Sequence, residues 1–221
     1  METQVDLTLL GALNPCLQAC SAETRRALVE RGVVRGFQAG TLLYQEREPA
    51  GIVLFPLRGA LQVSKTASQG RRQVMCNLNP TSCGGICLLM MPAHSLGDVR
   101  ASAEGEVLVL PRLDFQQMAR QDPVLCQTGW NAAAECMGHL SGIVENLSFH
   151  KVAERVAFML LESTAKDGDL VRRTQGELAA EVGTTREVVA RCLAGLQTAG
   201  AVRLGRGRIT VLKREKLRQE V

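Results

Sequence analysis

The order of apolar and polar residues divides the chain into helical and strand-like stretches. Residues 7–35 have the spacing of short helices, in which Val33 is the last apolar contact. From residue 36 to about residue 111 the chain carries short β-prone runs separated by glycine, with Gly59 expected as a turn residue between two of them. The runs that predict strands are Thr41–Tyr44, Ile52–Phe55, Ala60–Val63 and Val107–Leu110. Short strands at this spacing are typical of a β-sandwich or a barrel.

One longer helix with a coiled-coil repeat is predicted over residues 123–147. Pro123 suits its first turn, where the missing N–H is not needed. Apolar residues then follow at alternating steps of four and three: Cys126, Trp130, Ala133, Met137, Leu140, Val144 and Leu147. This repeat of about 3.5 residues is that of a coiled-coil seam, with Cys126 as a small apolar filler. The helix either lies on its own domain or pairs with a second copy, and we expect a parallel homodimer.

A helix-turn-helix pattern occupies residues 174–196. Two capping boxes mark the helix starts, Thr174 with Glu177 and Thr184 with Glu187, and Gly183 between them supplies the turn. The apolar positions that we expect to face each other are Leu178, Val182, Val188, Leu193 and Leu196. Residues 202–211 then form two β-prone runs about a Gly-Arg-Gly turn, which predicts the wing of a winged helix.

The second helix of this unit carries side chains suited to reading bases. Arg186, Glu187 and Arg191 lie near its N-terminal end, and positions 187 and 191 share a face. Arginine donates two hydrogen bonds to guanine and a carboxylate accepts one from cytosine, so these residues predict base readout. Residues expected to contact the DNA backbone are Thr174, Thr185, Arg172, Arg173, Arg206 and Arg208. The alternative is that Glu187 only caps its helix and the arginines are solvated.

Composition agrees with a globular protein whose C-terminal part binds a polyanion. Of the 221 residues 46% are hydrophobic, which excludes a disordered chain, and no apolar run is long enough to span a bilayer. Residues 148–221 hold 14 lysines and arginines against 9 acids, whereas residues 1–147 hold 12 against 13. The net charge of +4 therefore resides in the C-terminal part. Because the chain starts without the features of a secretory signal, we expect a cytoplasmic protein with mostly reduced cysteines and no membrane partner.

These motifs resemble those of the Crp–Fnr family of bacterial transcription regulators. The likeness rests on Glu177-Leu-Ala, Gly183, Arg186-Glu-x-Val-x-Arg-x-Leu and Gly205-Arg-Gly-Arg-Ile, and it extends to residues 36–66 and 146–161. It implies an α+β fold: a double-stranded β-helix (jelly-roll) sensor domain over residues 1–122, a dimerisation helix over 123–147 and a winged helix-turn-helix over 148–221. It also implies a homodimer, not an enzyme, that binds palindromic double-stranded DNA with TGTGA-type half-sites and contacts RNA polymerase.

The sensor domain departs from the cyclic-AMP branch of that family. The ribose-binding Glu of that branch falls at Ile86, and its phosphate-binding Arg and Ser fall near His94–Gly97. A cyclic phosphate without an arginine partner loses its strongest charge-assisted contacts, which argues against cyclic AMP. Arg100 is the alternative phosphate partner.

Cysteines offer a different kind of signal. The candidates are Cys16 and Cys20 near the N-terminus, and Cys76, Cys83 and Cys87 where the nucleotide pocket is expected. Thiolates suit iron–sulfur clusters and thiophilic metals, and paired thiols oxidise reversibly. Haem, with His94 or a cysteine as axial ligand, is a further alternative. We expect a thiol, metal or redox signal; the other hypotheses are a small-molecule effector with silent cysteines, and a redox enzyme or metal carrier.

Overall fold

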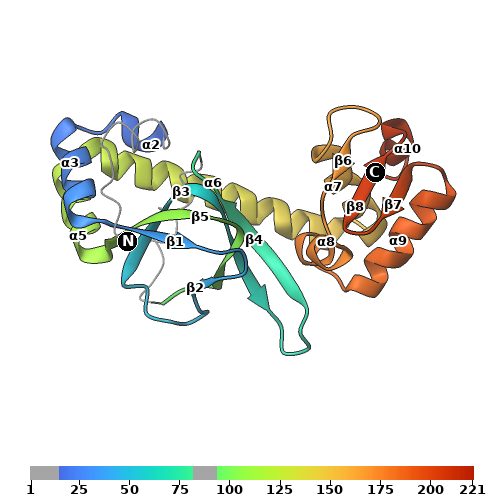
Figure 1. Cartoon of the computed structure of the whole chain (residues 1–221), viewed down its shortest axis with the longest axis horizontal. Helices are drawn as coiled ribbons and strands as arrows, with labels where there is room; N and C mark the ends of the chain where they lie inside the picture. The colour runs from blue at the N-terminus through green and yellow to red at the C-terminus, as the bar shows by residue number, and fades with distance from the viewer. Residues whose placement is uncertain (1–14, 82–93) are drawn as a thin grey trace. The chain divides into compact units, whose positions relative to one another are not determined.

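The computed structural model describes residues 15–81 and 94–221, which divide into two compact units (Figure 1). Of the described residues, the first unit comprises 15–65, 75–81 and 94–140, and the second comprises Thr66–Val74 and Ser141–Val221. The long helix α6 (Pro123–Phe149) contributes to both units and starts at the predicted proline. Across the described residues, none of the helices has the length and hydropathy needed to cross a bilayer.

An antiparallel sheet forms the body of the first unit. Its strands are β1 (Val33–Phe37), β2 (Leu42–Tyr44), β3 (Ile52–Thr66), β4 (Arg72–Leu78) and β5 (Asp98–Pro111). The strand order is β1-β5-β3-β4, and β2 also pairs with β5. The two long strands β3 and β5 pair along most of their length, from Ile52 opposite Pro111 to Ser64 opposite Asp98. The predicted β-rich domain is therefore confirmed.

Three details of the predicted first unit are wrong. The helix α3 (Ala22–Arg31) ends before Val33, which begins strand β1. The runs predicted as two strands, 52–55 and 60–63, belong to the single strand β3. Gly59 lies inside that strand at φ +73°, where a Cβ would stand 2.2 Å from the carbonyl oxygen of Glu104. Glycine therefore permits a bulge and a close backbone approach within β3, rather than a turn between strands.

The sheet is buried on both faces, which explains its nearly continuous apolar runs. Alternate residues of β3 point to opposite sides: Val53 and Phe55 join one apolar cluster and Leu54 joins another. The first cluster also contains residues of α2 (Pro15–Gln18), α3, α5 (Arg112–Gln121) and α6, among them Leu17, Leu28, Phe115 and Leu125. Four helices thus cover one face of the sheet, and the second apolar cluster lies against the opposite face. Strand residues that point to either face are therefore apolar.

Asp122 joins α3 to the start of α6. One carboxylate oxygen, Oδ1, accepts hydrogen bonds from the backbone N–H groups of Val124 (2.9 Å) and Leu125 (3.3 Å), as an N-cap residue does. The other, Oδ2, accepts from the Ser21 N–H (3.1 Å) and from the Thr24 hydroxyl (2.6 Å). Burial alone would raise the pKa of Asp122, but these four hydrogen bonds outweigh it and lower the pKa. The buried carboxylate is therefore held ionised.

The second unit is a winged helix-turn-helix, as predicted. Its helices are α7 (Val152–Glu162), α8 (Gln175–Val182), α9 (Arg186–Thr198) and α10 (Arg214–Arg218). Its strands are β6 (Leu170–Val171), β7 (Val202–Gly205) and β8 (Arg208–Val211), in the order β6-β8-β7. Their apolar faces form one core, with Leu160, Leu178, Leu193 and Val211 fully buried. Strands β7 and β8 are the predicted wing.

Candidate nucleic-acid interface

The turn between α8 and α9 is fixed by local hydrogen bonds. At the start of α8 the Thr174 hydroxyl accepts from the Glu177 N–H (3.2 Å), and the Glu177 carboxylate accepts from the Thr174 N–H (2.6 Å). This confirms the first predicted capping box. At the end of α8, Gly183 adopts left-handed dihedral angles, φ 70° and ψ 46°, which are costly for residues with a Cβ. The chain reverses there and enters α9.

The second predicted capping box, Thr184 with Glu187, is wrong. Thr185 is the residue before α9, and its side chain makes no capping hydrogen bond. The Thr184 N–H instead donates to the carbonyl oxygen of Ala179 (2.9 Å), because the glycine turn places it against the end of α8. Hydrogen bonds from the Glu187 N–H and from the Thr185 hydroxyl lower the pKa of Glu187. Glu187 is therefore an exposed, ionised carboxylate at the start of α9.

Helix α9 is anchored by one face and exposed on the other. Val189 and Leu193 are fully buried in the unit's core, and Leu196 is 6% exposed. Val188, predicted to face the core, is only half-buried, because the inward positions follow the 189-193-196 spacing. The outward face carries Arg186, Glu187 and Arg191. A rigidly packed helix therefore presents two arginines and one carboxylate to solvent.

A cleft of about 470 Å³ joins the start of α8, helix α9 and the wing. Arg173, Arg186, Arg206 and Arg208 line it, and the described lining itself contains no acidic residue, although the Glu181 carboxylate contacts Arg173 at 3.1 Å. The N-terminal end of α8 opens onto the cleft through Thr174 and Gln175, and a helix N-terminus favours anions. Four positive charges and a helix dipole thus converge on one surface, which suits a phosphate backbone.

The wing brings one of these arginines close to the turn. Gly205 lies opposite Arg208 in the β7–β8 pair. A Cβ at residue 205 would stand 2.8 Å from the Arg208 Nε, so the Arg208 side chain lies directly against the glycine. Gly207 has a φ of +64°, which completes the tight turn. The Gly-Arg-Gly sequence therefore serves both the turn and the placement of Arg208.

All nine residues expected to contact DNA are exposed in the structure. They are Arg172, Arg173, Thr174, Thr185, Arg186, Glu187, Arg191, Arg206 and Arg208. Four of the arginines and Thr174 line the cleft, while Glu187 and Arg191 lie outside its lining on α9. Sequence reasoning missed Gln175 and Gly176, which also line the cleft. Their position in the first turn of a helix with a capping box was the available signal.

Most of the coiled-coil repeat on α6 is exposed, although Ala133 and Leu140 are half-buried. We call Trp130, Ala133, Met137, Leu140, Val144 and Leu147 the apolar stripe. Trp130 is 61% exposed, Met137 69% and Val144 62%. The helix packs on its own unit through a different face, which includes the buried residues Leu125 and Ala132. The described residues of the chain therefore leave Trp130, Met137 and Val144 largely uncovered.

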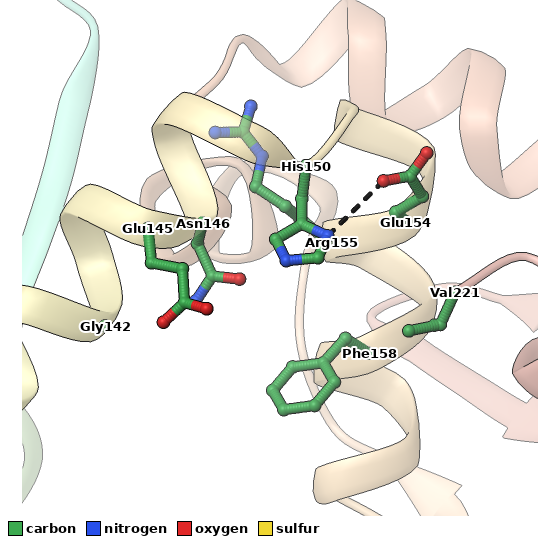
Figure 2. A pocket seen from close by; sticks show the side chains of 8 residues that line it. All are labelled: Gly142, Glu145, Asn146, His150, Glu154, Arg155, Phe158 and Val221. Atoms are coloured by element: carbon green, nitrogen blue, oxygen red, sulfur yellow. Dashed lines mark ion pairs between the residues drawn. The ribbon is translucent and has the colours of Figure 1, made fainter.

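A second cavity, of about 350 Å³, lies where α6 ends and α7 begins (Figure 2). Glu145 and Asn146 come from α6, and Glu154 and Phe158 come from α7. The His150 Nδ1 lies 3.4 Å from the Glu154 carboxylate, as the dashed line in Figure 2 marks. The two carboxylates of this lining stand beside His150 and Arg155, so its charged residues are mixed, whereas those described in the lining of the cleft at the wing are all basic.

The candidate sensor cysteines are only partly within the described residues. Cys83 and Cys87 lie outside them, as does Ile86, and of Cys16 the structure describes only its place in α2. Cys20 is buried in the apolar cluster beneath the sheet, and burial raises the pKa of its thiol to about 11. Cys76 is half-buried on β4. Across residues 15–81 and 94–221, no three metal-ligating side chains are grouped.

The segment expected to hold a cyclic phosphate has other interactions. His94 is exposed and forms an isolated β-bridge with Pro49. Ser95 is buried, and its hydroxyl donates to the carbonyl oxygen of Gly97 (2.7 Å). The Arg100 Nη2 lies 3.7 Å from the Asp98 carboxylate. The Ser95 hydroxyl is therefore already used within its own loop.

Comparison with known proteins assigns both units. The family description of a Crp-like helix-turn-helix domain matches residues 154–220, and that of a cyclic nucleotide-binding domain matches residues 34–122. The cyclic AMP receptor protein of Thermus thermophilus is 29% identical over 154 residues, which cover 69% of this chain and 71% of the relative. The chain belongs to the Crp–Fnr family. It is therefore a DNA-binding transcription regulator, as the resemblance of its motifs implied.

Other known proteins match over most of the chain. The cAMP-activated global transcriptional regulator Vfr of Pseudomonas aeruginosa is 26% identical over 179 residues, covering 76% of this chain and 84% of Vfr. The structure of FixK2 from Bradyrhizobium japonicum has a TM-score of 0.69 at 25% identity, covering 85% of this chain and 96% of FixK2. The c-di-GMP responsive regulator CLP of Xanthomonas campestris shares the fold, with a TM-score of 0.79 at 17% identity over 87% of this chain and all of CLP.

Proposed function

We propose that this Crp–Fnr regulator binds DNA as a homodimer and reads a near-palindrome with TGTGA-type half-sites. The observation that carries the proposal is the outward face of α9, with Arg186, Glu187 and Arg191 exposed beside a cleft whose described lining holds four arginines and no acidic residue. Its opposite face is locked in the core, so the helix can enter a major groove without losing its packing. RNA polymerase is the second macromolecular partner that the family resemblance implies.

The side chains of the interface divide into two roles. Arg186 and Arg191 donate to guanine O6 and N7, and the ionised Glu187 accepts from cytosine N4, which specifies G·C pairs. Arg173, Arg206 and Arg208 in the cleft contact phosphates and fix the orientation of the protein. Arg172, Thr174 and Thr185, exposed next to the helix starts, add further backbone contacts.

We propose that residues 123–147 form the dimerisation helix. The apolar stripe is exposed in the single chain while another face of α6 packs on the sheet domain. Its alternating steps of four and three suit a second copy of the same helix, in which each side chain meets its counterpart. A dimer places two recognition helices on two half-sites, which a palindromic operator requires.

For the signal, we propose a thiol, metal or redox event at Cys76, Cys83 and Cys87 rather than cyclic AMP. Ile86 and His94 stand where an acidic and a phosphate-binding residue are expected, and the Ser95 hydroxyl is used within its loop. The buried Cys20, with its raised pKa, is the least suited of the candidates to form a thiolate. The second hypothesis is a small-molecule effector, haem included, with silent cysteines. Metal content, a visible spectrum of anaerobically purified protein and a cyclic-AMP titration separate these hypotheses.

The DNA roles are tested with two arginine variants and a control. Arg191→Ala is expected to lose about 1–3 kcal/mol of binding free energy for a TGTGA palindrome and almost none for shuffled DNA, because only base contacts discriminate sequence. Arg206→Ala is expected to weaken binding to both duplexes and to reduce the slope of log affinity against log salt concentration by about one. Arg120→Ala, exposed on α5 of the other unit, makes the same charge change and is expected to bind as the parent does. Fluorescence anisotropy at several salt concentrations measures all three.

The roles are refuted if Arg191→Ala and Arg206→Ala lose equal affinity on both duplexes. A wild-type protein that binds the palindrome no more tightly than shuffled DNA contradicts the half-site itself.

A further inference from the structure

One arginine of the cleft is held by a carboxylate. The Arg173 Nε donates to the Glu181 Oε1 at 3.1 Å, and the Arg173 Nη1 donates to the carbonyl oxygen of Arg172 at 3.0 Å. Glu181 lies in the last turn of α8, and its side chain is 17% exposed, against 49% for Arg173. The guanidinium is therefore held through two of its three nitrogens, while about half of the Arg173 side chain is exposed to solvent.

This fixation matters because the surroundings repel the guanidinium. Arg186, Arg206 and Arg208 line the same cleft, and like charges favour conformations in which Arg173 turns away. A guanidinium has five N–H donors, of which Glu181 and Arg172 use two. Three donors stay available for a phosphate oxygen, in a fixed direction.

We propose that Glu181 is a positioning residue for DNA binding, which orients Arg173 toward a backbone phosphate; this rests on the proposed DNA-binding role of Arg173. Holding the side chain in place before binding removes the entropic cost of immobilising it in the complex. Glu181 also carries a negative charge, which by itself opposes DNA binding. The two effects have opposite signs, so the charge and the hydrogen bond must be separated by experiment.

The matched pair Glu181→Gln and Glu181→Ala makes that separation. Both variants lack the charge, but only glutamine has a side-chain oxygen that accepts from the Arg173 Nε–H. We expect Glu181→Ala to bind a DNA duplex about threefold to tenfold more weakly than Glu181→Gln. In an Arg173→Ala background the difference between the two substitutions is expected to vanish, because the residue being positioned is gone.

The measurement is fluorescence anisotropy of the full chain with a random-sequence duplex and with a TGTGA palindrome, because a backbone contact acts on both. Equal urea midpoints show that the variants fold alike. If Glu181→Ala and Glu181→Gln bind equally, or if their difference persists without Arg173, positioning by Glu181 is wrong while the proposed function stands. If the wild-type protein binds neither duplex, the proposed function fails, and this inference fails with it.

Discussion

Replacing Met137 by glutamate tests the proposed dimer at the centre of the apolar stripe. Met137 is 69% exposed, and Trp130 and Val144 lie seven residues away on either side, on the same face of α6. In a parallel dimer the substitution places two carboxylates opposite each other in an apolar contact. In the single chain the position already faces solvent, so Met137→Glu leaves the fold of each copy intact.

The size of the effect follows from the exposed fraction. Full burial of a methionine side chain is worth about 1.5–3 kcal/mol. Because 69% of Met137 is exposed before association, the dimer gains about 1–2 kcal/mol from it in each copy, or about 2–4 kcal/mol in total. Losing this raises the dimer dissociation constant by about 30-fold to 700-fold, before the repulsion of the two carboxylates adds to the loss.

Sedimentation velocity and the emission of Trp130 measure the dimer independently. Trp130 is the chain's single tryptophan and lies in the stripe, so we expect its emission to shift to longer wavelength when the dimer dissociates on dilution. Asn131→Glu is the matched control: it is exposed on α6 and lies about 120° around the helix from Met137. Dimerisation of Met137→Glu with wild-type affinity, or equal weakening by Asn131→Glu, refutes the assignment of the stripe.

Two further predictions concern stability. Asp122→Asn is expected to lower the free energy of unfolding by about 1–3 kcal/mol at neutral pH, because an amide NH₂ cannot accept the hydrogen bonds from Ser21 and Thr24. The lowered pKa of Asp122 stabilises the native fold above its ordinary value of 3.8, and this contribution is lost as the pH falls through the native pKa. Between about pH 5 and about pH 3, the free energy of unfolding in urea is therefore expected to fall more steeply for the wild type than for Asp122→Asn. Parallel plots of this free energy against pH for the two proteins contradict this account. Val189→Ala is expected to lower the free energy of unfolding by about 2 kcal/mol, because Val189 is fully buried, and Val188→Ala by much less. Equal urea midpoints for the two variants would contradict the assignment of Val189, rather than Val188, to the core.

The DNA-binding unit was predictable because its determinants are local. Thr174 and Glu177 are three residues apart, Gly183 needs only its own dihedral angles, and the wing turn spans a few residues. The predictions that are wrong concern positions whose conformation depends on contacts with a neighbouring helix or strand. The Thr184 N–H donates to the end of α8, so α9 starts one residue later than predicted. Val189 rather than Val188 is the core residue because it lies four residues before the buried Leu193, on the same face of the helix.

Contacts between distant residues were not predictable in this way. Nothing in the sequence around Asp122 indicates that Ser21 and Thr24, about a hundred positions earlier, complete its hydrogen bonds. Arg173 and Glu181 are eight residues apart, and the arginine precedes the helix that carries its partner, so the i,i+4 rule does not find the pair. Strand β3 reads as two strands because its bulge at Gly59 depends on the backbone of β5 opposite.

The apolar stripe shows where sequence and structure each contribute. A repeat of about 3.5 residues reveals that one face of α6 is apolar, but a helix covering its own domain gives a similar pattern. The burial of Leu125 and Ala132 resolves this, because they lie on a different face from Met137 and already connect α6 to the sheet. Two apolar faces on one helix need two partners, and the described residues of the first unit cover only one of these faces. The proposed dimerisation therefore rests on the face that these residues leave uncovered, as well as on the repeat.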